Sequence, residues 1–147
     1  MDNDDDAYNE KALASYRYVV RRAGRDVPIQ PSLRGKLQPN DENVRVIFVI
    51  APGCKDVELS LTSYQMQRSH YDPNWEQIRI DFATGHFDAG QHEMVVDLPA
   101  PCWSQVDLAF AGSLARIGPN PPSYYGDRLI DAAHGGSRAC APVTVIE

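Results

Sequence analysis

Apolar residues recur at every second position in five separate stretches of the chain after residue 43. These stretches are residues 44–50, 57–63, 78–82, 94–98 and 106–110. Successive side chains of an extended chain point to opposite faces, so this alternation buries one face of a strand and exposes the other. Residues typical of turns, mainly Gly, Pro and Asp, separate the stretches. The pattern therefore predicts a mainly β protein, built as a sandwich or a barrel.

Chain length and spacing limit the fold further. The chain has 147 residues, which is the size of one domain. The intervals between the stretches are too short for repeated helical crossovers, so we expect antiparallel pairing. Residues 143–146 predict one more, closing strand. The longest apolar run, residues 46–51, is far too short to cross a bilayer, so we expect no membrane insertion.

The first 40 residues differ in composition from the rest, and we expect an N-terminal arm at 1–40 and a sandwich domain at 41–147. Residues 1–6 read as an acidic tail, and a proline-containing linker ends the arm. Residues 7–23 fit two patterns. Their apolar spacing, followed by Gly24, favours a helix in the first half, whereas alternation in the second half suits a strand equally well.

Charge is distributed unevenly along the chain. The net charge is −6, made up of −5 over residues 1–10, +6 over residues 11–36 and −7 over residues 37–147. An acidic body repels nucleic acid and anionic membranes, so neither is an expected partner. The basic segment is either a solvated face or a contact surface for a protein partner or a second copy of the chain. We therefore expect any self-association to use the N-terminal arm.

Three cysteines, Cys54, Cys102 and Cys140, leave the redox state of the chain open. None belongs to a Cys-x-x-Cys pair, which excludes the usual zinc-finger and thioredoxin patterns. The odd number allows one disulfide with one thiol left over, or three free thiols. The first residues lack the basic and apolar regions of a secretory signal. Two expectations follow: a cytoplasmic protein, or an exported protein whose signal is not visible in this chain.

Several segments between Cys54 and Gly136 resemble an uncharacterised domain of bacterial secreted and cell-surface proteins. The most specific is the segment Pro99 to Asp107, which is similar to the pattern Pro-x-Cys-aromatic-x-Gln-Val-Asp, with Ala100 as an extra residue. The other similar segments are residues 54–64, 83–92, 95–99 and 124–130. The resemblance implies an immunoglobulin-like β-sandwich that serves as a binding or structural module outside the cytoplasm. It also implies that cysteines such as Cys54 and Cys102 pair, and Cys140 could replace either partner.

The sequence contains no convincing catalytic or metal-binding pattern. His86 and His92 flank an acidic residue, but no further ligand stands at a spacing that zinc would need, so we expect no metal and no cofactor. There is no Gly-x-Ser-x-Gly motif and no phosphate-binding loop. A cysteine at the start of a strand, such as Cys102, is far more often packed or disulfide-bonded than nucleophilic. A small enzyme with a pocket around His70, His86 or Cys102 remains the last of three alternatives.

Aromatic residues in two turn-rich segments are the candidate contact groups. Tyr71 and Trp75 lie in one segment, and Tyr124 and Tyr125 lie in the other. Exposed aromatic side chains are good contacts for glycans and peptides, although they also plug the open ends of sandwiches. The leading prediction is a non-enzymatic extracellular or cell-envelope module for adhesion, scaffolding or self-assembly. The alternative is a carbohydrate- or peptide-binding domain that uses these four residues.

Overall fold

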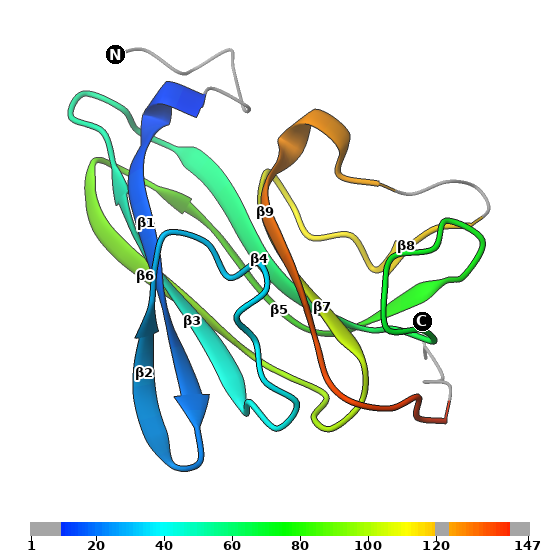
Figure 1. Cartoon of the computed structure of the whole chain (residues 1–147). Helices are drawn as coiled ribbons and strands as arrows, with labels where there is room; N and C mark the ends of the chain where they lie inside the picture. The colour runs from blue at the N-terminus through cyan, green and yellow to red at the C-terminus, as the bar shows by residue number, and fades with distance from the viewer. Residues whose placement is uncertain (1–9, 120–123, 142–147) are drawn as a thin grey trace.

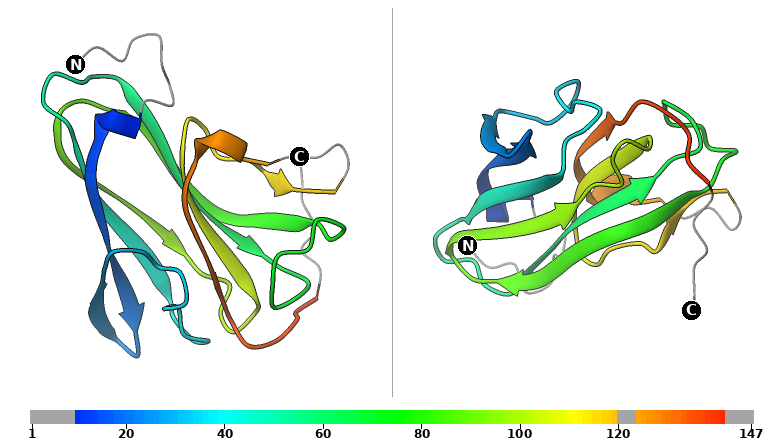
Figure 2. Two further views of the ribbon diagram at one scale, coloured as in Figure 1. Left: turned by 45° about the horizontal axis from the view of Figure 1, so that its top comes forward. Right: turned by 90° about the horizontal axis from the view of Figure 1, so that it is seen from below.

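Two antiparallel β-sheets pack face to face in the computed structural model, which describes residues 10–119 and 124–141 (Figure 1). The expected acidic tail (1–6) and closing strand (143–146) lie outside the described residues. The first sheet has the strand order β2-β1-β3-β6, and the second has the order β8-β5-β4-β7-β9. Figure 2 shows the β1–β2 hairpin on one side of the molecule and the β8–η2 region on the other.

The strands follow one another along the chain with two short 3-10 helices. In the described residues the elements are η1 (Glu10–Ala12), β1 (Leu13–Arg22), β2 (Arg25–Ile29), β3 (Asn43–Ile50), β4 (Val57–Gln65), β5 (Gln77–Phe87), β6 (Gly90–Asp97), β7 (Ser104–Phe110), β8 (Arg116–Ile117), η2 (Gly126–Arg128) and β9 (Leu129–Gly135). The chain changes sheet between β3 and β4, between β5 and β6, and between β6 and β7. These changes give the alternating connections of an immunoglobulin-like sandwich, so the predicted fold class is confirmed.

The alternating residues of the sequence form the core. Val44, Val46 and Phe48 of β3 are fully buried, and they face residues such as Leu59 and Leu108 in the second sheet. Their neighbours in β3 are more exposed, as an alternating strand requires. Burial of apolar surface between the two sheets is the main stabilising contribution to this fold.

The N-terminal segment is part of the sandwich, which corrects the expected boundary at residue 40. β1 pairs antiparallel with β3 along nearly its whole length, and β2 pairs with the outer edge of β1. Tyr18 and Val20 of β1 are buried in the same core as the later strands. Of the two patterns open for residues 7–23, the strand is therefore adopted from Leu13 onward. Tertiary burial of alternate side chains decides between two local preferences of similar strength.

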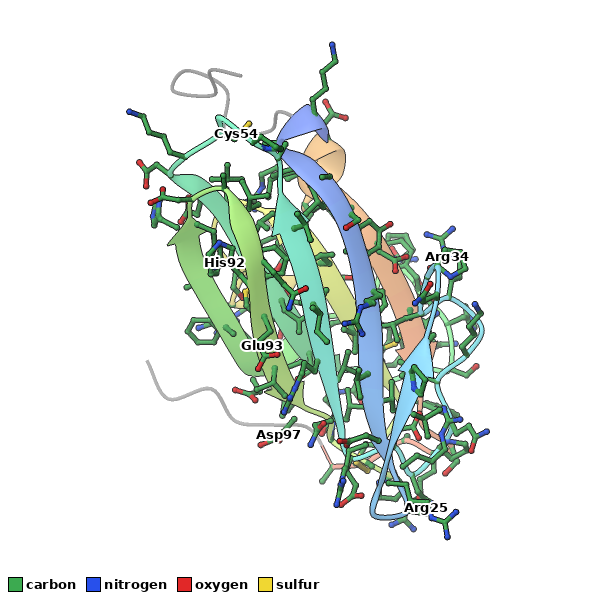
Figure 3. All side chains as sticks on the ribbon, turned by 90° about the vertical axis from the view of Figure 1, so that its left-hand side faces the viewer. Arg25, Arg34, Cys54, His92, Glu93 and Asp97 are labelled. Carbon is green, nitrogen blue, oxygen red and sulfur yellow. A yellow bond between two sulfur atoms is a disulfide. The ribbon has the colours of Figure 1, made fainter. Side chains whose placement is uncertain are left out.

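The disulfide joins Cys102 to Cys140, with the two Cα atoms 5.5 Å apart, and Cys54 is a buried free thiol. The pairing of Cys54 with Cys102 that the resemblance implied is thus wrong. The reason is the antiparallel register of β3 and β6. Cys54 follows the end of β3 that pairs with Gly90, whereas Cys102 follows the other end of β6, so they lie at opposite ends of the sandwich. Figure 3 shows Cys54 far from Asp97, the last residue of β6.

Candidate functional site

The outer face of the second sheet is covered by further chain over β4 and β7. All seven residues of β7 are buried, although alternate residues of this strand point away from the sandwich core. The cover is the connection between β7 and β9, whose described parts are residues 111–119 and 124–128, including β8 and η2 (Figure 1). Polar side chains on the outer face of β4 and β7 are enclosed as a result.

Tyrosine hydroxyl groups attach this cover to the sheet. Tyr125 Oη lies within hydrogen-bond distance of Tyr64 Oη and Thr62 Oγ1 on β4, and it accepts a hydrogen bond from the backbone N–H of Leu114. Tyr64 Oη donates to the carbonyl oxygen of Leu114 at 2.8 Å. Burial and the neighbouring Tyr125 raise the pKa of Tyr64. The two rings form a small second core with Ile117, so the cover is firmly packed.

A pocket of about 230 Å³ opens between this cover, β7 and β9. Three aliphatic side chains, Ile117, Leu129 and Ala132, line part of its wall. Tyr71 and Tyr124 line its exposed side, each about two-fifths exposed, with ring centroids 6.4 Å apart in an edge-to-face arrangement. Pockets for drug-sized ligands typically enclose roughly 300–1,000 Å³. This one is smaller and suits a single side chain or a single sugar ring.

Three polar residues form the floor of the pocket. Gln105 and Asp107 come from alternate positions of β7, and His134 pairs with Gln105 on β9. The Gln105 amide nitrogen donates to both carboxylate oxygens of Asp107, at 2.9 and 3.0 Å. Its amide oxygen accepts from Gln77 Nε2 at 3.1 Å and lies 3.0 Å from His134 Nε2. An amide oxygen only accepts, so His134 Nε2 carries a hydrogen in this contact.

The floor has unusual titration behaviour. Burial, together with the negative charge of Asp131 and against the hydrogen bond from Gln105, raises the pKa of Asp107 to about 7. Burial, helped by the nearby charges of His70 and Arg34, lowers the pKa of His134. Perturbed groups that line a cleft are candidates for a functional site, because structural requirements alone rarely leave a carboxyl group buried without a cation. The pocket therefore has a neutral histidine and a carboxyl group that titrates near neutral pH.

The structure brings three of the four predicted aromatic residues to this pocket. Tyr71 and Tyr124 reach it from two separate loops, and Tyr125 lines it from the buried side. Partial burial and a hydrogen bond with Tyr124 raise the pKa of Tyr71 to about 12. Trp75 does not line this pocket. Its ring packs under the Arg68 guanidinium, 4.3 Å from the ring centroid, and borders a separate depression with Trp103.

The floor residues are the ones that sequence reasoning did not assign to a site. Gln105 and Asp107 stand out as polar residues at alternate positions of a mainly apolar strand. A solvated strand face shows the same pattern, so the two cases are distinguished by the cover that residues 111–119 and 124–128 form. His134 carries no local signal, because its role depends on the pairing of β9 with β7.

Other candidate residues are placed apart from the pocket. His86 contacts Asp56 and Glu58 at 3.0 and 3.6 Å, while His92 packs against the rings of Phe48 and Phe87. Within residues 10–119 and 124–141, no three or more His, Cys, Asp and Glu side chains are arranged to hold a metal ion. Over the same ranges, no helix has the length and apolar character that crossing a bilayer would require.

Comparisons with known proteins assign no family to the chain. No protein-family model matches the sequence, and no curated protein matches it significantly. The functional argument therefore depends on the pocket itself.

Proposed function

We propose that this chain is a non-enzymatic recognition module of an extracellular or cell-envelope protein, which holds one residue of a glycan or peptide in the pocket beneath Tyr71 and Tyr124. The observation that carries the proposal is the convergence of loop aromatics over a buried polar floor. Amphipathic aromatic side chains supply contact area at low entropic cost, and the few floor groups supply orientation.

The disulfide supports the proposed compartment. Disulfides persist in oxidising environments and are rare in reducing cytosol. The Cys102–Cys140 bond also removes the only thiol that we weighed as a nucleophile, since a disulfide sulfur is not a thiolate. Binding without chemistry is therefore the proposal that fits these residues best.

Array screening tests the proposed site. The oxidised protein is screened against glycan and peptide arrays beside Tyr124→Ala and Phe82→Ala, because Phe82 is an equally exposed aromatic residue outside the pocket. We expect a hit whose signal falls at least ten-fold in Tyr124→Ala and stays unchanged in Phe82→Ala. Trp75→Ala reports whether the neighbouring depression contributes. An identical array signature in Tyr124→Ala and the parent protein would reject this pocket.

A second candidate function is self-assembly through opposite sheet edges. Arg25 lies at the β2 edge of the first sheet, whereas Glu93 and Asp97 lie on β6, its other edge (Figure 3). β2 itself carries Asp26 beside Arg25, but residues 11–36 as a whole have a net charge of +6, and opposite charges on the two sides favour association of one copy with the next. Part of the basic segment is already used internally, however, because Arg22 binds Asp41 at 2.8 Å. Sedimentation at low and high salt tests the idea, and a monomer at every concentration and ionic strength would contradict it.

A further inference from the structure

We infer that the pocket takes the side-chain ammonium group of a lysine from a protein partner, with its charge placed against Asp107. This inference rests on the proposed recognition function and narrows it from a glycan or peptide to one chemical group. Four observations lead to it. Asp107 lacks a cationic partner among the described residues, the Gln105 amide directs its nitrogen toward Asp107, part of the pocket wall is aliphatic, and two tyrosine rings lie at its exposed side.

Asp107 has no cationic partner among the residues that the structure describes. Its side chain is almost completely buried, and within residues 10–119 and 124–141 its carboxylate oxygens accept hydrogen bonds from the Gln105 amide nitrogen alone. The charge that acts on its pKa is that of Asp131, which is also negative. A carboxylate has about four acceptor positions, so a single amide leaves most of them open. Buried charges in proteins are normally paired, which makes a ligand cation the missing partner.

The neighbouring Gln105 amide directs its nitrogen toward Asp107. Its oxygen accepts a hydrogen bond from Gln77 Nε2 and lies within hydrogen-bond distance of His134 Nε2, so the oxygen is occupied on the side away from the carboxylate. The floor therefore presents acceptor groups to the pocket. Desolvation keeps His134 neutral, so the histidine does not repel a positive charge. A ligand group with several N–H donors complements this floor.

The wall of the pocket distinguishes a lysine side chain from a sugar ring. Ile117, Leu129 and Ala132 offer no hydrogen-bonding side-chain groups, and the ionisable and amide groups gather on the floor. A sugar carries hydroxyl groups around its ring, and several of them would be buried against aliphatic side chains at a cost in free energy. Lysine has an apolar stem and a single polar end, which matches this division.

The mouth of the pocket also favours a cation. The rings of Tyr71 and Tyr124 meet edge to face at the exposed side of the pocket. Aromatic faces attract cations, with a gain of roughly 0.5–1 kcal/mol at exposed sites and more where the cation is desolvated. The ammonium group is compact, whereas a guanidinium group is planar and wider. We therefore assign the pocket to lysine rather than to arginine.

The test compares ligands that differ only in the group at the end of the side chain. The probes are the blocked tripeptide Gly-Lys-Gly and its versions with Nε-acetyl-lysine, norleucine or arginine in the centre, titrated into the oxidised protein at pH 8 by NMR. Glucosamine and N-acetylglucosamine form a second pair, because an amino sugar is another source of an ammonium group. We expect the lysine peptide to bind at least ten-fold more tightly than every other probe.

Two variants test whether the preference for lysine depends on the Asp107 carboxylate. Asp107→Asn is expected to abolish the preference for lysine over acetyl-lysine, whereas Asp127→Asn removes the same charge from the exposed surface of η2 and should keep it. Equal affinity for lysine and acetyl-lysine would overturn the inference, and so would tighter binding of arginine or glucosamine. The comparison of peptides needs no variant, so the inference stays testable even if Asp107→Asn does not fold.

The outcome also separates this inference from the proposed function. A ligand that binds through Tyr124 without any preference for an ammonium group would overturn the lysine assignment and leave the pocket as a recognition site. If Tyr124→Ala still binds every ligand that the parent protein binds, both the lysine assignment and the proposed recognition site are overturned.

Discussion

At the scale of single residues, Asp107 is placed where it costs folding free energy. A carboxyl group buried beside a second acid and bonded to one amide is more stable in its protonated form. Its neighbour Asp131 shows the opposite arrangement, since it accepts hydrogen bonds from Tyr18, Ser32 and the backbone of Leu33. Asp131 is thus a structural residue that joins β9 to the first sheet. Among the described residues, Asp107 forms side-chain hydrogen bonds within its own strand only, which supports the binding role proposed for it.

Replacing Asp107 by Asn should stabilise the free protein at alkaline pH. The pKa of Asp107 rises from 3.8 to about 7 on folding, so its stabilising contribution is complete below pH 4 and is lost as the pH rises through 7. Asparagine does not ionise, and at pH 8 it removes a cost of roughly 1–4 kcal/mol. Urea denaturation should therefore give Asp107→Asn a higher free energy of unfolding than the parent protein at pH 8, and an equal one at pH 4. A variant less stable than the parent at pH 8 would contradict this reasoning.

At the scale of elements, the strands whose side chains alternate were predictable because strand burial is a local property. In the stretch 44–50 every second residue from Val44 is apolar and buried, and the stretch forms β3. In the N-terminal segment, by contrast, helical spacing and alternation coexist, and pairing with β3 decides the outcome. The site was predictable only in its loops. Tyr71 and Tyr124 carry the aromatic signal, but nothing local shows that residues 111–119 and 124–128 fold back over the polar residues of β7.

Gly136 allows the chain after β9 to pass close enough to Cys102 for Cys140 to form the disulfide. After β9, Gly136 has a φ of 89°, and a Cβ atom there would lie 2.1 Å from the carbonyl oxygen of Cys102. The chain passes this close because Ser137 N–H bonds to the carbonyl of Pro101 and Trp103 N–H bonds to that of Arg138. This contact places Cys140 beside Cys102. The pairing of Cys102 with Cys140 could not be predicted from cysteine spacing, because it depends on this close approach of two distant segments.

Gly136→Ala should therefore impair formation of the disulfide. The methyl group would overlap backbone atoms, which cannot move aside as a side chain can, and the positive φ adds strain. We expect thiol titration of the unfolded, unreduced protein to rise from one thiol per chain toward three. Gly24→Ala is the matched control, because its φ of 73° is also positive but its Cβ would meet open space. One thiol in both variants would show that the close approach is not required.

The whole molecule is asymmetric between its two sheets. The outer face of the first sheet carries charge toward solvent, as Glu93 in Figure 3 shows, whereas the outer face of β4 and β7 in the second sheet lies under residues 111–119 and 124–128. The disulfide adds to this difference by linking Cys102, next to β7, to the chain after β9. A bridge with a sequence separation of 38 is expected to stabilise the fold by about 4 kcal/mol. Rigid support is thus concentrated around the strands that carry the pocket.

Binding of the lysine peptide should weaken in acid, because protonation of Asp107 removes the negative charge that faces the ammonium group. With a pKa near 7, Asp107 is mostly ionised at pH 8 and mostly protonated at pH 5.5, while lysine stays charged at both values. Protonation of His134 at low pH would add a positive charge and act in the same direction. The titratable and charged groups around Asp107 on the elements packed against it are Tyr64 of β4, Arg79 of β5, Asp131 and His134 of β9, Arg128 of η2, and Tyr71, Tyr124 and Tyr125 of the loops.

The two cations in this set have other partners. Arg79 stacks on Phe82 and lies within hydrogen-bond distance of Ser113, and Arg128 donates to the carbonyl oxygens of Phe110 and Gly112. Tyr64 and Tyr71 stay neutral over this pH range because burial raises the pKa of each further above it. We therefore expect the dissociation constant to rise roughly ten- to thirty-fold between pH 8 and pH 5.5. In Asp107→Asn the dissociation constant should change little with pH. An equally steep pH dependence in that variant would contradict the assignment to Asp107 and would assign the titration to His134.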